Sequence, residues 1–181
     1  MLVLLWVGCT KTVAPEVAVP EPVAPAPVVP ADPMAPRPFT VEQLRAAFPV
    51  GTKLRFRIEA EGKPAIEERW EVVAADAVGC TIASKVHDAA SGEVVEDEGG
   101  AVSTWAELVE HAAFPVALTK IEDGSVTVPA GTFETRRYTV SDLDGTVRVF
   151  DFAPSLPGPP VKLTATRDGA VALSLTLLER S

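Results

Sequence analysis

Proline divides this chain into two parts with different folding prospects. Nine of its seventeen prolines fall within residues 13–38, interleaved with alanine and valine. Each proline fixes φ and removes a backbone donor, so this segment cannot form a helix or a central strand. Its composition predicts an extended, disordered spacer, roughly 80 Å long if fully stretched at ~3.1 Å per residue. We therefore expect a tether over residues 10–38 and a single folded domain over residues 39–181.

A short apolar run precedes the tether and ends in Gly8-Cys9. This pattern resembles the end of a bacterial lipoprotein signal peptide, in which a small residue precedes the cysteine that receives acyl chains. Trp6 stands where that family usually has leucine, and no basic residue precedes the run, so we expect the true start upstream of Met1. The resemblance implies a signal peptide over residues 1–9, lipidation of Cys9, and an outer membrane lipoprotein of the cell envelope that faces the periplasm or the surface. The alternative is a buried N-terminal strand.

The charge of the chain limits its partners. The formal net charge is −9 at pH 7. A chain this acidic lacks the lysine and arginine that neutralise phosphates, so we expect no nucleic acid partner. The expected partners are the membrane, through the lipid anchor, and either an apolar ligand or an envelope protein.

Alternating apolar and polar residues predict that the domain is mainly β. Leu54, Phe56 and Ile58 share one face of a predicted strand, and Asp-Gly pairs at 123–124, 144–145 and 168–169 are hairpin signals. The expected strands are residues 53–60, 65–75, 78–86, 93–98, 119–123, 125–128, 133–141, 146–153, 161–167 and 170–179. We expect an α+β fold in which about eight to ten strands form a curved antiparallel sheet or half-barrel with two short helices.

Two capping boxes predict those helices. Thr40 is followed by Gln43, and Thr104 by Glu107, which is the spacing at which the two residues cap one helix reciprocally. Each predicted helix ends at the same five residues, Ala-Ala-Phe-Pro-Val, at 46–50 and 112–116. The repetition is consistent with a duplicated unit, and equally with two uses of the same helix-stop chemistry.

The first predicted hairpin places a carboxylate on an apolar face. An odd-residue loop sets Phe56 opposite Glu68 and Leu54 opposite Trp70. A bare carboxylate is too costly to bury, so Glu68 either serves as a polar group in a ligand cavity or turns out toward an edge. If a cavity lies between sheet and helices, we expect roughly several hundred cubic ångströms of space. Its expected lining is Phe56, Glu68, Trp70, Trp105 and Phe150.

Signatures of catalysis are absent from the sequence. It has no Gly-x-Ser-x-Gly elbow, no phosphate-binding glycine loop, no paired zinc cysteines and no His-Glu-x-x-His. His87 and His111 are expected at capping or surface positions, and Cys80 as a small buried hydrophobe. We therefore expect a protein that is not an enzyme, with no catalytic residue, no metal and no cofactor. An interaction protein is the main alternative to a ligand-binding module, and a hydrolase would need a nucleophile and a base that converge in a cleft.

The C-terminal half carries a second resemblance. The hairpin Val128-Pro129-Ala130-Gly131 with Phe133, and the loop that begins at Leu156-Pro157, lie within residues 103–179, which resemble uncharacterised exported bacterial families. These families bring no catalytic or binding residues with them. Two helices on a curved sheet are also similar to the lipoprotein-carrier half-barrels of the periplasm, whose concave face holds acyl chains.

Overall fold

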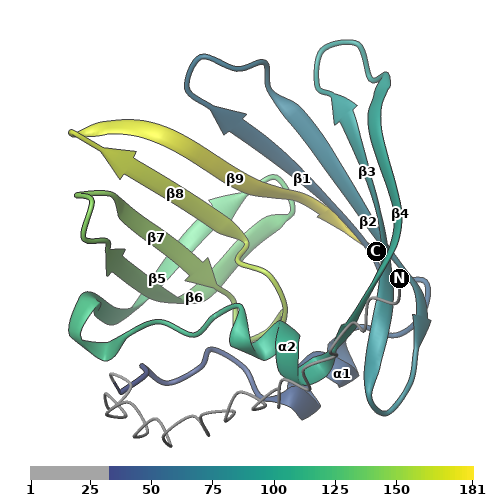
Figure 1. Cartoon of the computed structure of the whole chain (residues 1–181), viewed down its shortest axis with the longest axis horizontal. Coiled ribbons are helices and arrows are strands. Elements are labelled where there is room, and N and C mark those ends of the chain that lie inside the picture. Colours follow the sequence, from purple (N-terminus) through teal and green to yellow (C-terminus); the bar gives the residue numbers. More distant parts are fainter. Residues whose placement is uncertain (1–32) are drawn as a thin grey trace, which may run out of the picture. The chain divides into compact units, whose positions relative to one another are not determined.

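The computed structural model describes residues 33–181, and these form one sheet with two short helices (Figure 1). Nine antiparallel strands lie in the order β4-β3-β2-β1-β9-β8-β7-β6-β5. They are β1 (Lys53–Ala60), β2 (Ile66–Ala75), β3 (Gly79–Asp88), β4 (Val94–Thr104), β5 (Thr119–Val128), β6 (Gly131–Ser141), β7 (Val147–Phe152), β8 (Lys162–Arg167) and β9 (Ala170–Arg180). The helices are α1 (Val41–Ala47), α2 (Trp105–Glu110) and the 3-10 turn η1 (Val116–Leu118). The predicted fold class, a curved antiparallel sheet with two short helices, is confirmed.

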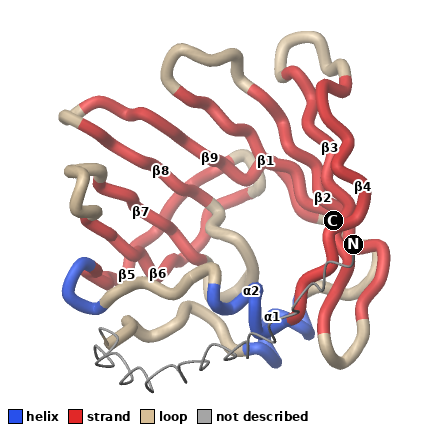
Figure 2. Tube along the Cα trace, in the orientation of Figure 1, coloured by secondary structure: helices blue, strands red, loops and turns tan. Residues whose placement is uncertain are grey.

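The sheet consists of two meanders that join where β1 pairs with β9. Strands β1 to β4 follow α1, and strands β5 to β9 follow α2. Figure 2 shows both helices at one end of the space between the two wings of strands. Neither helix has the length and apolar character that a membrane-spanning segment requires.

Both predicted capping boxes are confirmed. At α1 the Thr40 N–H donates to Gln43 Oε1 at 2.8 Å, and the Gln43 N–H donates to Thr40 Oγ1 at 3.3 Å. At α2 the equivalent bonds between Thr104 and Glu107 are 2.8 and 3.1 Å. These side chains satisfy N–H groups that have no partner inside the helix, which explains why such short helices start where they do.

The predicted register of the first hairpin is confirmed, whereas one predicted turn is wrong. Phe56 lies opposite Glu68 on β2. The Asp-Gly pair at 123–124 does not turn the chain, because β5 continues through it. Asp123 pairs with Arg136 and Gly124 with Thr135 in an unbroken ladder with β6. The long-range pairing of both flanks therefore overrides the local turn preference.

The folded body also includes the last residues of the proline-rich segment. The Ala35 N–H donates to the Phe114 carbonyl at 2.8 Å, and the Val116 N–H donates to the Pro33 carbonyl at 2.9 Å. The Tyr138 hydroxyl donates to the Pro36 carbonyl at 2.9 Å. These contacts begin ahead of Phe39, where the sequence placed the start of the domain. Cys9 and the rest of the tether lie outside the described residues.

The tightest packing lies at the helix-covered end of the sheet. Tyr138 is 0% exposed, and Phe56 and Trp105 are each 1% exposed. Tyr138 and Phe152 meet edge to face with ring centroids 5.4 Å apart, and Phe39 meets Phe152 in the same way at 6.0 Å. This end of the concave face therefore carries a buried aromatic core.

Candidate functional site

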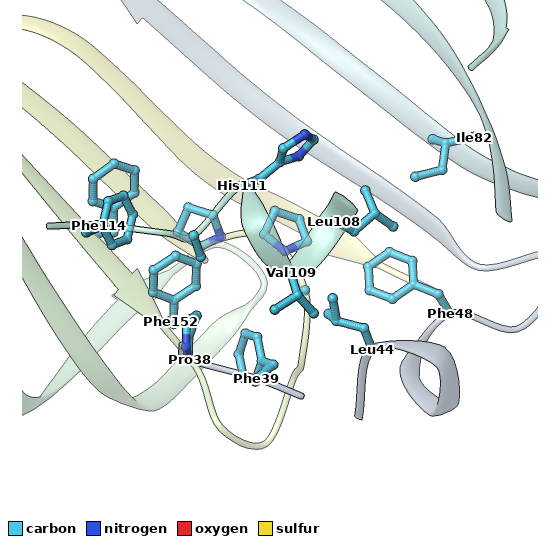
Figure 3. Close-up of a pocket in the computed structure, with 15 residues that line it drawn as sticks. Pro38, Phe39, Leu44, Phe48, Ile82, Leu108, Val109, His111, Phe114 and Phe152 are labelled. Carbon is cyan, nitrogen blue, oxygen red and sulfur yellow. The ribbon is translucent and has the colours of Figure 1, made fainter. Parts of the chain in front are cut away.

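Beside this core, the two helices and the concave face of the sheet enclose an apolar cavity of about 170 Å³ (Figure 3). The residues around it come from α1, α2, β3, β7 and the segments before α1, after each helix and between β7 and β8. They are Pro38, Phe39, Leu44, Phe48, Ile82, Leu108, Val109, His111, Ala112, Phe114, Phe150, Phe152, Gly158, Pro159 and Pro160. His111 is the single titratable side chain among them.

Helical spacing brings the apolar side chains of both helices to the cavity. Leu44 and Phe48 stand four residues apart on and just after α1, and Leu108 and Ala112 have the same spacing on and just after α2. Residues four apart lie on one face of a helix, so each helix presents a narrow apolar stripe. Figure 3 shows Leu44 and Phe48 gathered near Leu108 and Val109.

The loop between β7 and β8 forms another wall and is held in place by Arg180. The Arg180 guanidinium donates to the Pro157 carbonyl at 3.3 Å and to the Ala47 carbonyl, and it lies 5.0 Å from the centre of the Phe48 ring. Burial lowers the pKa of this guanidinium. Gly158 has φ +149°, and a Cβ at this position would lie 2.8 Å from the Phe48 ring. Only glycine lets the loop approach α1 so closely.

Beyond the cavity, the concave face stays apolar but is less covered. Ile58, Ile66, Val86, Leu163 and Leu175 are half-buried. A second hollow of about 310 Å³ lies at this open end and is lined by Ile58, Ala60, Lys63, Pro64, Ile66, Asp88 and Val95. An apolar surface therefore continues from the cavity toward the hairpin loop that joins β1 and β2.

Glu68 stands on this apolar surface. The Trp70 indole N–H donates to Glu68 Oε1 at 2.6 Å, and the Ser84 hydroxyl donates to the same oxygen at 2.9 Å. Because β2 lies between β1 and β3, Glu68 has no sheet edge to turn toward. Two donors thus hold the carboxylate on the face where the sequence predicted it.

The structure does not bring all five expected lining residues to one cavity. Phe150 lines the cavity, whereas Phe56 and Trp105 are buried in the core. The Trp105 indole N–H donates to the Asp76 carbonyl at 3.0 Å, which fixes the ring beneath α2. Trp70 and Glu68 lie on the concave face outside the cavity wall.

Sequence reasoning did not assign the helical residues to the cavity. Leu44, Phe48, Leu108 and Phe114 line it. The sequence signal for these residues was the apolar stripe that follows each capping box. What the stripe could not indicate is that the two helices leave a space between them rather than filling it.

The remaining candidate groups serve structural roles. Cys80 is buried, and burial raises the pKa of its thiol. His87 is buried with Nδ1 3.1 Å from the Gly92 carbonyl oxygen, and His111 caps the exposed end of α2. Within residues 33–181, no three His, Cys, Asp or Glu side chains come together as metal ligands would.

Comparison with known proteins identifies a fold but no family. No protein family model matches the chain. No curated protein matches it either. Among solved structures it is similar to MucB in a crystal structure of MucB in complex with MucA(peri), with 12% sequence identity and a TM-score of 0.50. The match covers 78% of this chain and 53% of the other, so this chain spans about half the length of that neighbour. At this identity the likeness extends to the fold alone.

Proposed function

We propose that this chain is a non-catalytic lipoprotein of the cell envelope whose domain binds an apolar ligand, such as an acyl chain. The observation that carries the proposal is the apolar cavity that adjoins a half-buried apolar concave face. Apolar space next to a few fixed polar groups is the usual form of a small-molecule site. The lipid anchor on Cys9 and the spacer after it are the parts of the proposal that rest on the sequence.

The size of the cavity suits one end of a chain-like ligand. A dry apolar cavity of roughly 150 Å³ is enough to bind benzene. The cavity here is about 170 Å³, so it accepts several methylene groups, and the remainder of a chain would lie on the adjoining concave face. Each methylene removed from water contributes about 0.8 kcal/mol to binding.

The lining supports binding without catalysis. A general base needs a partner that orients it, and a nucleophile needs a base within hydrogen-bond reach. His111 is the cavity's one titratable group, and it is exposed at the end of α2. No serine, threonine or cysteine is among the lining residues of this cavity.

A ligand-displacement experiment tests the binding proposal. The full chain should carry copurifying lipid when extracted in mild detergent, as measured by native mass spectrometry, and should enhance the fluorescence of N-phenyl-1-naphthylamine. Leu108→Trp fills the cavity and should abolish the fluorescence gain at an unchanged melting temperature. Leu143→Trp is the matched control, because Leu143 is 94% exposed and lies outside the cavity. Wild-type protein that binds neither lipid nor probe would refute the proposal.

The anchor requires a separate test. Cys9→Ser should release the protein from the membrane fraction and remove incorporated labelled fatty acid, while Cys80→Ser should change neither. Retention of both signals in Cys9→Ser would exclude lipidation at this cysteine.

A partner protein is the second candidate ligand. The structural neighbour was solved with a bound chain, and in this protein β4 is an edge strand whose residues 94–102 are all exposed. A photo-crosslinker at Val102 should give one discrete adduct in cells if a partner docks at this edge. The same crosslinker at Leu143 is the control, and equal labelling from both positions would argue against a specific partner.

A further inference from the structure

The Glu68 carboxylate has one occupied and one available oxygen. Trp70 and Ser84 both donate to Oε1, at 2.6 and 2.9 Å. Oε2 accepts no hydrogen bond from any residue that the structure describes, and it is not among the buried side-chain atoms that lack a partner. The two donors orient the carboxylate and leave Oε2 accessible on an apolar surface.

Charges on β1 to β3 are sorted between the two faces of the sheet. Lys53, Arg55 and Arg57 alternate with Leu54, Phe56 and Ile58, so they point to the outer face. There each of them pairs with a glutamate, at 3.6 Å for Lys53 to Glu71, 3.2 Å for Arg55 to Glu67 and 2.9 Å for Arg57 to Glu59.

The remaining cations of these strands follow the same rule. Arg69 and Lys85 also alternate with concave-face residues, and Lys85 pairs with Asp97 at 3.0 Å. At the concave-face positions of β1 to β3, the charged side chains are Glu68 and Asp88. Asp88 is engaged by its own turn, since its Oδ1 accepts N–H bonds from Ala90 and Ser91. The strand positions of β1 to β3 on this face therefore carry acidic and no basic side chains, with Glu68 as the available acceptor. The basic groups near this surface are Lys63 in the hairpin loop and Arg180, whose guanidinium is engaged by the Pro157 and Ala47 carbonyls.

The carboxylate lies within reach of the apolar cavity. Ile82 lines the cavity, and Ser84, which contacts Glu68, is the next residue on the same face of β3. Two residues along a strand span about 7 Å. A ligand with its alkyl end in the cavity would therefore pass Glu68 with its head group.

We infer that the ligand is a single-chain amphiphile with a positively charged head, an ammonium or a guanidinium, that binds Glu68 Oε2 while its alkyl chain lies on the concave face and in the cavity. This inference rests on the proposed function and adds the class of head group to it. An anionic head placed at Glu68, such as a fatty acid carboxylate, would face a negative charge that no cation of the described residues pairs, which disfavours binding at this position.

Three amphiphiles with the same chain test this inference. Dodecylammonium, dodecanol and dodecanoate are titrated below their micelle concentrations against the fluorescent probe bound to the full chain. Wild-type protein should bind dodecylammonium about tenfold to a hundredfold more tightly than dodecanol, the range expected for a hydrogen bond between charged groups. Dodecanoate should bind most weakly.

Two glutamine variants of β2 test whether the charge of Glu68 causes the preference for ammonium. Glu68→Gln keeps an oxygen that accepts from Trp70 and Ser84, and it should remove the preference for ammonium while the affinity for dodecanol stays constant. Glu71→Gln is the matched control, since Glu71 lies on the outer face of the same strand and pairs with Lys53, and it should leave the preference intact.

The outcomes separate this inference from the function it rests on. Equal binding of all three amphiphiles would overturn the charged-head inference and leave the apolar site standing. Failure of all three to bind would overturn the proposed function itself. A lysine-containing apolar peptide that displaces the probe where dodecylammonium does not would also overturn the inference, because the site would then belong to a partner chain.

Discussion

The two ends of the concave face are made of the same strands but do different things. On β1, Phe56 is 1% exposed in the helix-covered end, whereas Ile58, the next residue on the same face, is half-buried in the open end. The alternation of the strand is the same at both positions. What differs is their packing: Phe56 belongs to one buried cluster with Leu44 of α1 and Trp105 of α2, and Ile58 does not. The strand pattern therefore decides which face is apolar, and the helices decide whether that face becomes a core or a groove.

Polar groups on the concave face differ in whether the protein itself satisfies their hydrogen bonds. The buried Tyr138 hydroxyl and the Trp105 indole each donate to a backbone carbonyl, of Pro36 and Asp76 respectively. Glu68, which lies opposite Phe56 in the ladder between β1 and β2, retains an oxygen without a protein partner among residues 33–181. The two satisfied groups stabilise the core, whereas the available oxygen of Glu68 is suited to accept a hydrogen bond from a ligand.

The largest predicted effect distinguishes Phe56 from Ile58. Phe56→Ala should lower the free energy of unfolding by about 3–5 kcal/mol, because it leaves a cavity in a core that cannot collapse. Ile58→Ala should cost only about 1 kcal/mol, since its side chain already meets solvent. Urea denaturation of both variants measures the difference. Equal losses would mean that the two ends of the face are not distinct.

The next effect concerns the loop between β7 and β8, which forms one wall of the cavity. Gly158→Ala should destabilise the fold by about 2 kcal/mol, because the new methyl group must displace the Phe48 ring. Gly145→Ala is the control, since Gly145 also has a positive φ, +83°, but has open space around it. Both variants carry backbone strain, so the difference between their melting temperatures measures the effect of the contact with Phe48. A Gly158→Ala variant no less stable than its control would show that the wall is not tightly packed.

Removal of the α2 cap should have a smaller effect. Thr104→Ala leaves the Glu107 N–H without its acceptor and should cost about 1 kcal/mol, the usual loss for an N-cap threonine. Because Leu108 and Val109 line the cavity, probe affinity should fall as well. Thr132→Ala on the exposed hairpin between β5 and β6 serves as the control. A loss of stability with unchanged probe affinity would show that α2 does not contribute to the binding site.

The smallest predicted effect depends on pH. Hydrogen bonds from Thr104 lower the pKa of Glu107 in the folded state. Its stabilisation is therefore present above the unfolded pKa, about 4.3, and is lost as the pH falls through the lower folded value. Glu107→Gln keeps an acceptor, as Gln43 does in α1, and removes the titration. The stability gap between wild type and variant should close between pH 5 and pH 2, and a constant gap would contradict this assignment.

The sequence predicted the structural features that depend on residues adjacent in the chain. Capping boxes, proline stops and the Asp168-Gly169 hairpin, with φ of +51° and +79°, depend on adjacent residues, and the structure has them where they were expected. The position of Glu68 followed from strand alternation and one loop length. In contrast, the cavity requires α1, α2, β7 and residues 158–160 to meet. No local rule specifies the distance at which such separated segments stop approaching one another.

The way the proline-rich segment joins the domain couples mechanical load to occupancy of the cavity. Pro38 and Phe39 line the cavity, and the residues just before them are held by bonds to Phe114, Val116 and Tyr138. Any force that enters through the chain ahead of Pro33 acts first on these few bonds and on that wall, before it reaches a strand of the sheet. Binding and detachment are coupled, so a ligand that fills the cavity and contacts Pro38 and Phe39 should raise the force needed to detach this segment from the domain. A ligand bound as proposed above would thus be held less firmly when this segment is pulled.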